Sequence, residues 1–184
     1  MIADYPVQDI KYLGKEIFIR MKKRWIWWFG KIVVLIFLVV FSYLIFYLTI
    51  LAGTIFLGGN VSMEPNKEVF DTLFHMSSSL LSAPEIIVLV IILPVFITIC
   101  SGIFQLSIAI ISKPNMSFLI TVIILIISAY YLKPYLIGNY LMLLRNQLFL
   151  ETGVENIGGF IVALLTGVVG YILGAIKVEK LDIY

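Results

Sequence analysis

The chain has 184 residues, of which 61% are apolar and only 13% are charged, and its formal net charge is +2. A water-soluble domain of this size does not need so many apolar residues to fill its core, so the composition excludes an ordinary soluble protein. We expect membrane lipid as a partner of this chain and no nucleic acid.

Residues 1–31 are expected to form a cytoplasmic segment in front of the membrane domain. Apolar residues recur there at three- and four-residue intervals, at Val7, Ile10, Leu13, Ile17 and Met21. Charged residues occupy the other faces, which predicts an amphipathic helix lying on the inner membrane surface. Two interpretations stay open: this helix anchors the chain to anionic lipid, or it docks a cytoplasmic partner.

Four stretches of about 20 residues or somewhat more or less contain no charged residue. About 20 residues is the length that a helix needs to cross about 30 Å of hydrocarbon. The four stretches are residues 32–57, 86–112, 116–132 and 157–176. Because unpaired backbone groups cost several kcal/mol each in lipid, these stretches should be helical despite their many Val and Ile residues. The sequence therefore predicts an all-α polytopic membrane protein. Its four-helix membrane domain covers residues 32–177, with outer loops 58–85 and 133–156 and a cytoplasmic tail 178–184.

The distribution of lysine and arginine predicts the orientation in the membrane. These residues are concentrated before the first span, and further ones lie at Lys113, Lys177 and Lys180, whereas the other side carries only Lys67, Lys133 and Arg145. Basic residues favour the cytoplasmic side of a membrane. We therefore expect a multi-pass protein of the cell membrane with both termini in the cytoplasm.

The first outer loop carries no recognisable site. Its residue His75 is the only histidine and has no second His or Cys nearby, so we expect no metal site.

In the second span, Pro94 predicts a kink, which serves either packing or a moving hinge. Gln105 is the most polar side chain deep in any span, and it either bonds to another helix or faces a transport pathway.

Residues 133–156 are largely apolar, but polar residues and glycines interrupt the apolar run. Their part from 135 to 145 is too hydrophobic for an exposed loop and too short to cross a bilayer, which predicts a helix that is interfacial or re-entrant in the outer leaflet. Pro134 would begin this helix. The residues that we expect to shape it are Gly138, Asn139, Tyr140 and Arg145.

Small residues follow one face of the fourth span, at Ala163, Gly167, Gly170 and Gly174. Such a stripe permits close contact between helices. The sequence leaves open whether the contact is with another helix of this chain or with a second membrane subunit.

No sequence pattern points to catalysis. The chain has no Gly-rich phosphate loop ending in Lys-Ser or Lys-Thr, no paired carboxylates within a span, and no Ser or Cys with a candidate base nearby. We expect that the chain is not an enzyme and binds no cofactor.

Three stretches match a known kind of protein. They are the basic and tryptophan-rich residues 20–28, residues 138–145 before the last span, and the glycine-rich last span ending at residues 177–183. Together they resemble the permease subunits of bacterial ABC exporters of the second type, especially those in Gram-positive peptide and antibiotic export or resistance operons. The resemblance runs from about Asp9 to the end of the chain and covers only the last four of six spans. Either another subunit supplies two spans, or this is a shortened or divergent member.

The resemblance implies partners. A cytoplasmic subunit would bind ATP and Mg²⁺, and it would be coupled to a surface formed by Tyr12, Lys15, Glu16 and Arg20. A second copy or a related permease subunit would complete the transport path. Residues 133–156 are similar to the family's extracellular re-entrant hairpin, although Gly138 stands where relatives often have proline.

Two functions follow from these observations. The first is a non-catalytic permease subunit of an ATP-driven exporter that moves a peptide, an antibiotic or a lipid-like amphipathic substrate. The alternative is a small four-helix accessory, immunity or assembly subunit that packs on another membrane protein through the glycine stripe of the fourth span.

Overall fold

The structure is a computed structural model that describes residues 24–59, 83–147, 149–150 and 152–180. Within these ranges the chain forms helices and turns, with one isolated β-bridge between Asn146 and Val154. The all-α prediction is therefore confirmed for the described part of the chain. The amphipathic helix expected before the first span lies outside the described residues.

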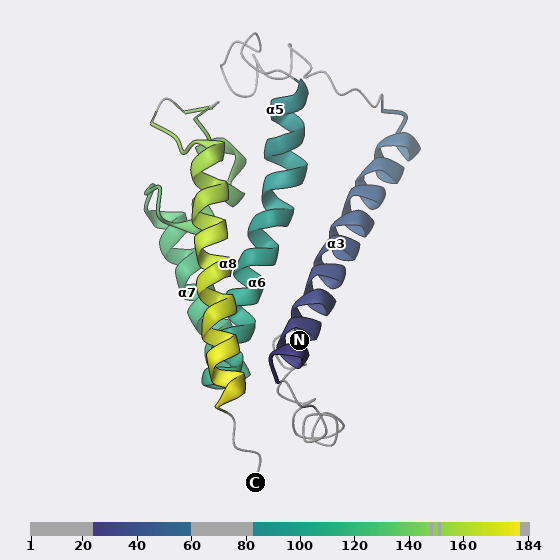
Figure 1. Cartoon of the computed structure of the whole chain (residues 1–184). Helices are drawn as coiled ribbons and strands as arrows, with labels where there is room; N and C mark the ends of the chain where they lie inside the picture. The colour runs from purple at the N-terminus through teal and green to yellow at the C-terminus, as the bar shows by residue number, and fades with distance from the viewer. Residues whose placement is uncertain (1–23, 60–82, 148, 151, 181–184) are drawn as a thin grey trace.

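In the described part of the chain, four long helical segments make up most of the fold (Figure 1). The first is α3 (Arg24–Phe56), and the second is built from α5 (Ala83–Ile87), the π-helical η2 (Val88–Ile92) and α6 (Leu93–Ile111). The third and fourth are α7 (Pro114–Tyr130) and α8 (Asn156–Glu179). Residues 131–155 join α7 to α8 and are called the crossover segment below. This segment contains two short 3-10 helices, η3 (Ile137–Leu141) and η4 (Leu143–Arg145).

Among the described residues, three helices are long and apolar enough to cross a membrane, judged by length and composition. They are Arg24–Phe56, Pro84–Ile111 and Asn156–Glu179. The helix at the third predicted span, α7, has 17 residues and falls short of that length. These features fit an all-α membrane protein. α3 also begins before the predicted span, so its first turns include the three tryptophans.

α6 is the central helix, because α8, α7 and α3 all pack against it. Its closest neighbour is α8, whose small residues face it. A Cβ atom added to Gly170 would lie 2.7 Å from the Cα atom of Phe104, so only a glycine lets the two backbones come this close. The Ser107 hydroxyl, on α6, donates a hydrogen bond to the Gly170 carbonyl across the same contact.

The first half of α3 joins this group through a buried tryptophan. Trp28 has no exposed surface, and its indole Nε1 donates to the Tyr171 carbonyl at 3.1 Å. A Cβ atom on Gly174 would overlap the Trp28 ring, at 2.2 Å from Cζ2. The hydrophobic core then continues along α3 to Val39 and against Leu106 and Ile110 of α6.

Beyond Val39, α3 leans away from the other helices (Figure 1). A space of about 460 Å³ lies between this half of α3 and the η2–α6 helical segment. Two tyrosines bridge it: the Tyr43 hydroxyl lies 2.9 Å from Thr98 Oγ1, and the Tyr47 hydroxyl donates to the Val90 carbonyl at 2.8 Å.

Pro94 explains why the Val90 carbonyl is free to accept that bond. Proline has no N–H, so the carbonyl four residues earlier loses its helical donor. The helix is π-helical just before Pro94, over Val88–Ile92. The structure places the donor, Tyr47, on α3.

Candidate functional site

The residues of the predicted ATPase-coupling surface, Tyr12, Lys15, Glu16 and Arg20, all lie outside the described residues. Their role stays a prediction. The other predicted sites are in the described part of the chain and fall into three places.

The first place is the junction of the crossover segment with the end of α7, where Arg145 is the central side chain. Its guanidinium donates to the carbonyls of Ser128, at 2.6 Å, and Ala129, which are among the last carbonyls of α7. Such carbonyls have no partner inside the helix and carry the negative end of its dipole. Arg145 therefore caps α7, while its Nη1 atom also donates to Asn139 Oδ1 at 2.6 Å.

Asn139 and Gly138 also make contacts at this junction between the crossover segment and the end of α7. Asn139 is fully buried, and its amide nitrogen donates to the carbonyls of Tyr131 and Lys133 at 2.9 and 2.8 Å. A Cβ atom on Gly138 would lie 2.6 Å from that of Ser128, so a larger residue would push the segment off α7.

Tyr140 links the crossover segment to α8. Its hydroxyl donates to the Pro134 carbonyl at 2.6 Å, and its ring covers Gly159 near the start of α8, where a Cβ atom would lie 2.8 Å from Tyr140 Cδ1. Burial, and to a lesser degree the Glu155 carboxylate, raises the pKa of the Tyr140 hydroxyl, which keeps it protonated and able to donate.

These contacts change the expected picture of the segment between α7 and α8. The sequence predicted one interfacial or re-entrant helix beginning at Pro134, whereas the structure has a turn at Pro134 followed by the two short 3-10 helices. The difference arises because Asn139 and Arg145 bond to backbone carbonyls of residues 128–133, which fixes the chain in a compact, non-α-helical path.

The second place is the glycine stripe of α8, whose four members, Ala163, Gly167, Gly170 and Gly174, are all buried. Gly167 faces Cys100, Gly170 faces the backbone at Phe104, and Gly174 faces Trp28. The chain's own helices thus occupy the stripe. Of the two interpretations that the sequence left open, these contacts favour packing within the chain.

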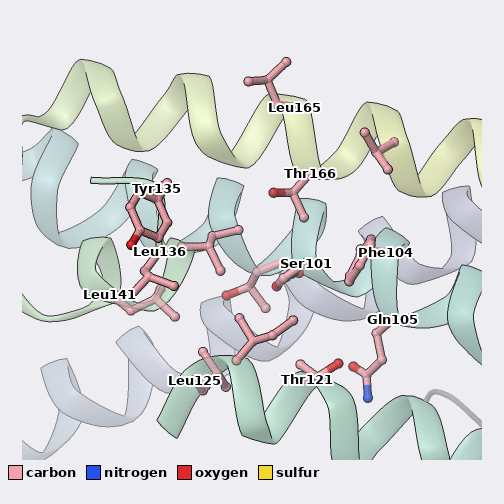
Figure 2. A pocket seen from close by; sticks show the side chains of 14 residues that line it. Ser101, Phe104, Gln105, Thr121, Leu125, Tyr135, Leu136, Leu141, Leu165 and Thr166 are labelled. Carbon is pink, nitrogen blue, oxygen red and sulfur yellow. Dashed lines mark hydrogen bonds between the residues drawn. The ribbon is translucent and has the colours of Figure 1, made fainter. Parts of the chain in front are cut away.

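The third place is a cavity of about 560 Å³ between α7 and α8, with α6 beside both and the crossover segment at one end (Figure 2). This volume is typical of small-molecule sites in proteins. Gln105, predicted from sequence as a possible pathway residue, lines it. Pro94 does not line it but lies further along α6, where it frees the carbonyl that holds Tyr47.

The cavity is mainly apolar with a few polar side chains, and none of its lining residues is charged. The polar ones are Thr98, Ser101, Gln105, Thr121, Tyr135 and Thr166. Three of them follow one face of α6 at three- and four-residue spacing, which makes a polar row along an otherwise apolar helix. The same row, Thr98, Ser101 and Gln105, also lines a smaller space of about 120 Å³ toward Leu35 and Val39 of α3.

Gln105 was predicted from the sequence as a possible pathway residue, whereas the other polar lining residues were not. The spacing of Thr98, Ser101 and Gln105 was visible as a pattern on one helix face. Thr121 and Thr166 come from other helices, and no local pattern connects them to α6. Among the described residues, no three His, Cys, Asp or Glu side chains gather where they could hold a metal ion.

Comparison with known proteins gives no match, whether with family models, with curated proteins or with solved structures.

Proposed function

We propose that the chain is a non-catalytic permease subunit of an ATP-driven ABC exporter, with a peptide, an antibiotic or a lipid-like amphipathic molecule as its substrate. The observation that carries this proposal is the likeness of three stretches, residues 20–28, 138–145 and the glycine-rich last span, to permeases of that type. They stand in the same order along the chain as in those permeases.

The cavity beside α6 supports the proposal. A subunit that encloses part of a transport path needs polar groups facing a space at membrane depth, and Gln105 with its neighbouring hydroxyls provides them. Because this polar row borders spaces on two sides of α6, toward α3 and between α7 and α8, a substrate group could pass along it.

In this proposal the chain crosses the cell membrane four times, with α7 as the third and shortest crossing. Both termini then lie in the cytoplasm, and residues 1–31 meet an ATP-binding subunit there. The concentration of lysine and arginine before residue 32, together with Lys113, Lys177 and Lys180, supports this orientation. ATP and Mg²⁺ would be bound by that partner, and a second copy or a related permease would complete the path.

The proposal predicts that the chain purifies from its own cells, in a mild detergent, together with a protein that hydrolyses ATP. Reversing charges at Lys15, Glu16 and Arg20 should lower the ATPase activity of the purified complex, because these side chains form the proposed coupling surface. The measurement is ATP turnover per complex, with and without the substitutions.

A charge reversal at Lys113, on the same proposed side of the membrane but outside the coupling surface, is the matched control and should leave turnover unchanged. Recovery of the chain without any ATP-hydrolysing protein, from cells that express its whole operon, would contradict the proposal.

A second function is favoured by one observation: the half of α3 beyond Val39 exposes a long run of large apolar side chains and leans away from the other helices (Figure 1). That surface suits an accessory, immunity or assembly subunit that packs on another membrane protein. The glycine stripe expected to serve such packing is occupied by α6 and Trp28, so the contact would instead use α3. Substituting Phe41 and Phe46 by alanine should then release the partner, while the charge reversals near Lys15 should have no effect.

A further inference from the structure

The threonine and serine hydroxyls that line the cavity between α7 and α8 have already used their hydrogens. Thr121 Oγ1 donates to the Ser117 carbonyl at 3.0 Å, and Thr166 Oγ1 donates to the Val162 carbonyl at 2.8 Å. Each hydroxyl has one hydrogen and two lone pairs. Toward the cavity these two side chains therefore offer acceptors and no donors.

Gln105 supplies the missing donors. Its side chain is half-buried, lines the cavity, and makes no hydrogen bond within the described part of the chain. A carboxamide carries two N–H donors and one acceptor oxygen. In an apolar setting a polar group without a partner costs free energy, so a ligand that pairs with this amide is favoured over hydrocarbon.

The lining also excludes charge. No lysine, arginine, aspartate or glutamate borders the cavity, and a charged group without a partner is expensive to place at membrane depth. The apolar remainder of the lining, including Leu125, Leu136 and Ile137, suits a hydrocarbon body. Figure 2 draws Gln105 and Thr121 toward one end of the cavity and Tyr135, Leu136 and Leu141 toward the other.

We propose that this cavity binds an uncharged, single-chain amphiphile whose polar group both donates and accepts hydrogen bonds, as an aliphatic alcohol or a primary amide does. The polar group pairs with the Gln105 amide and with a hydroxyl oxygen such as that of Thr121, and the hydrocarbon chain extends toward the crossover segment. The proposal concerns binding only, so it stands whether or not the chain serves an exporter.

Photolabelling of the purified full chain in a nonionic detergent tests this inference. The probe is oleyl alcohol with a diazirine in its chain, and the labelled residues are mapped by peptide mass spectrometry. We expect labels on lining residues such as Leu136, Ile137 and Val169. Unlabelled oleyl alcohol and oleamide should compete, whereas methyl oleate, which only accepts hydrogen bonds, and oleate, which is charged, should compete about 2- to 10-fold less well, the factor that one lost hydrogen bond gives.

Two pairs of variants distinguish binding in the cavity from partition of the probe into the detergent micelle. Gln105→Leu should lower cavity labelling about 2- to 10-fold, while Gln147→Leu, an exposed glutamine outside the cavity, should not change it. Thr121→Val should weaken labelling, because it removes the oxygen that pairs with the ligand. Thr49→Val should not, although Thr49 makes the same type of bond to the carbonyl four residues earlier, at 2.8 Å.

The inference is overturned if methyl oleate competes as well as oleyl alcohol, or if the probe labels only the exposed face of α3, which would mean partition into the micelle. Equal labelling in Gln105→Leu and Gln147→Leu would overturn it as well. Should Gln105→Leu fail to fold, the competition series on the unaltered chain still decides the outcome. The charge reversals at Lys15, Glu16 and Arg20 should leave labelling of the cavity unchanged. Labelling therefore tests the binding inference, and ATP turnover tests the exporter proposal, independently of each other.

Discussion

α6 makes two contacts that differ in kind. Against α8, the backbones meet across glycines, and Ser107 bonds directly to the Gly170 carbonyl. Between α6 and the half of α3 beyond Val39, a space of about 460 Å³ remains, and only the hydroxyls of Tyr43 and Tyr47 make hydrogen bonds across it in the described part of the chain.

The difference shows which parts of the molecule are fixed to one another. A close-packed contact loses many dispersion interactions at once when it opens, so α6 and α8 stay together. A hydrogen bond contributes only about 0.5 to 1.5 kcal/mol net, so the two tyrosine bonds can break without disturbing the core. We therefore predict that α6, α7, α8 and the crossover segment move together as one rigid unit, and that α3 beyond Val39 separates from it more easily.

The largest expected effect comes from enlarging the tight contact. Gly170→Leu would force a side chain into the backbone of α6, where a Cβ atom alone would lie 2.7 Å from Phe104 Cα. Overpacking typically costs about 1 to 3 kcal/mol, and a clash with backbone belongs at the upper end. The thermal midpoint of the detergent-purified protein should fall sharply.

Gly53 of α3 is the matched control, because a Cβ atom there would meet nothing within 4 Å. Gly53→Leu should leave the thermal midpoint unchanged or raise it, since leucine favours a helix more than glycine does. Equal losses in the two variants would break the contrast between the two contacts.

A smaller effect is expected at the end of the rigid unit, where Arg145 caps α7. Arg145→Met removes charge-assisted bonds to Ser128, Ala129 and Asn139. Because Arg145 is only half-buried, water can replace part of these bonds, and we expect a total loss of about 2 kcal/mol. Arg145→Lys should recover only part of the loss in thermal stability, because an ammonium group cannot fork between these acceptors. Lys133→Met, at an exposed cation of the same segment, should change stability little, and a loss as large as that of Arg145→Met would contradict the cap.

The smallest effect is expected at the loose contact. Tyr47→Phe deletes the bond to the Val90 carbonyl, which should cost about 0.5 to 1.5 kcal/mol and let α3 move outward. Spin labels at positions 51 and 91, which border the space beside α3, should report a longer and broader distance distribution by pulsed electron resonance. Tyr130→Phe, at an exposed tyrosine, is the control, and an unchanged distribution in Tyr47→Phe would show that the hydroxyl does not hold the helix.

Helix positions were predictable because apolar length and glycine spacing are local properties. The fourth predicted span, residues 157–176, differs from α8 by one residue at its start and three at its end. The crossover segment was less predictable. Its path depends on Arg145 and Asn139 reaching carbonyls that α7 leaves unpaired, and a sequence pattern does not say which carbonyls will lie within reach.

The candidate site was predictable only in part for the same reason. Gln105 stood out as a lone amide in an apolar run, but the cavity exists because α7 and α8 both pack on α6, and that depends on tertiary contacts. The bond between Tyr47 and the carbonyl freed by Pro94 likewise joins residues that are far apart in the sequence.

The central claim is that the chain crosses the membrane four times with both ends in the cytoplasm, since the coupling surface and the outer position of the crossover segment depend on it. Single cysteines at positions 2, 113, 135 and 183, in a background carrying Cys100→Ala, can be treated in intact cells with a maleimide that does not cross membranes. We predict labelling at position 135 alone, with the other three labelled only after the cells are opened. Labelling of position 2 and position 183 from opposite sides of the membrane would contradict the account.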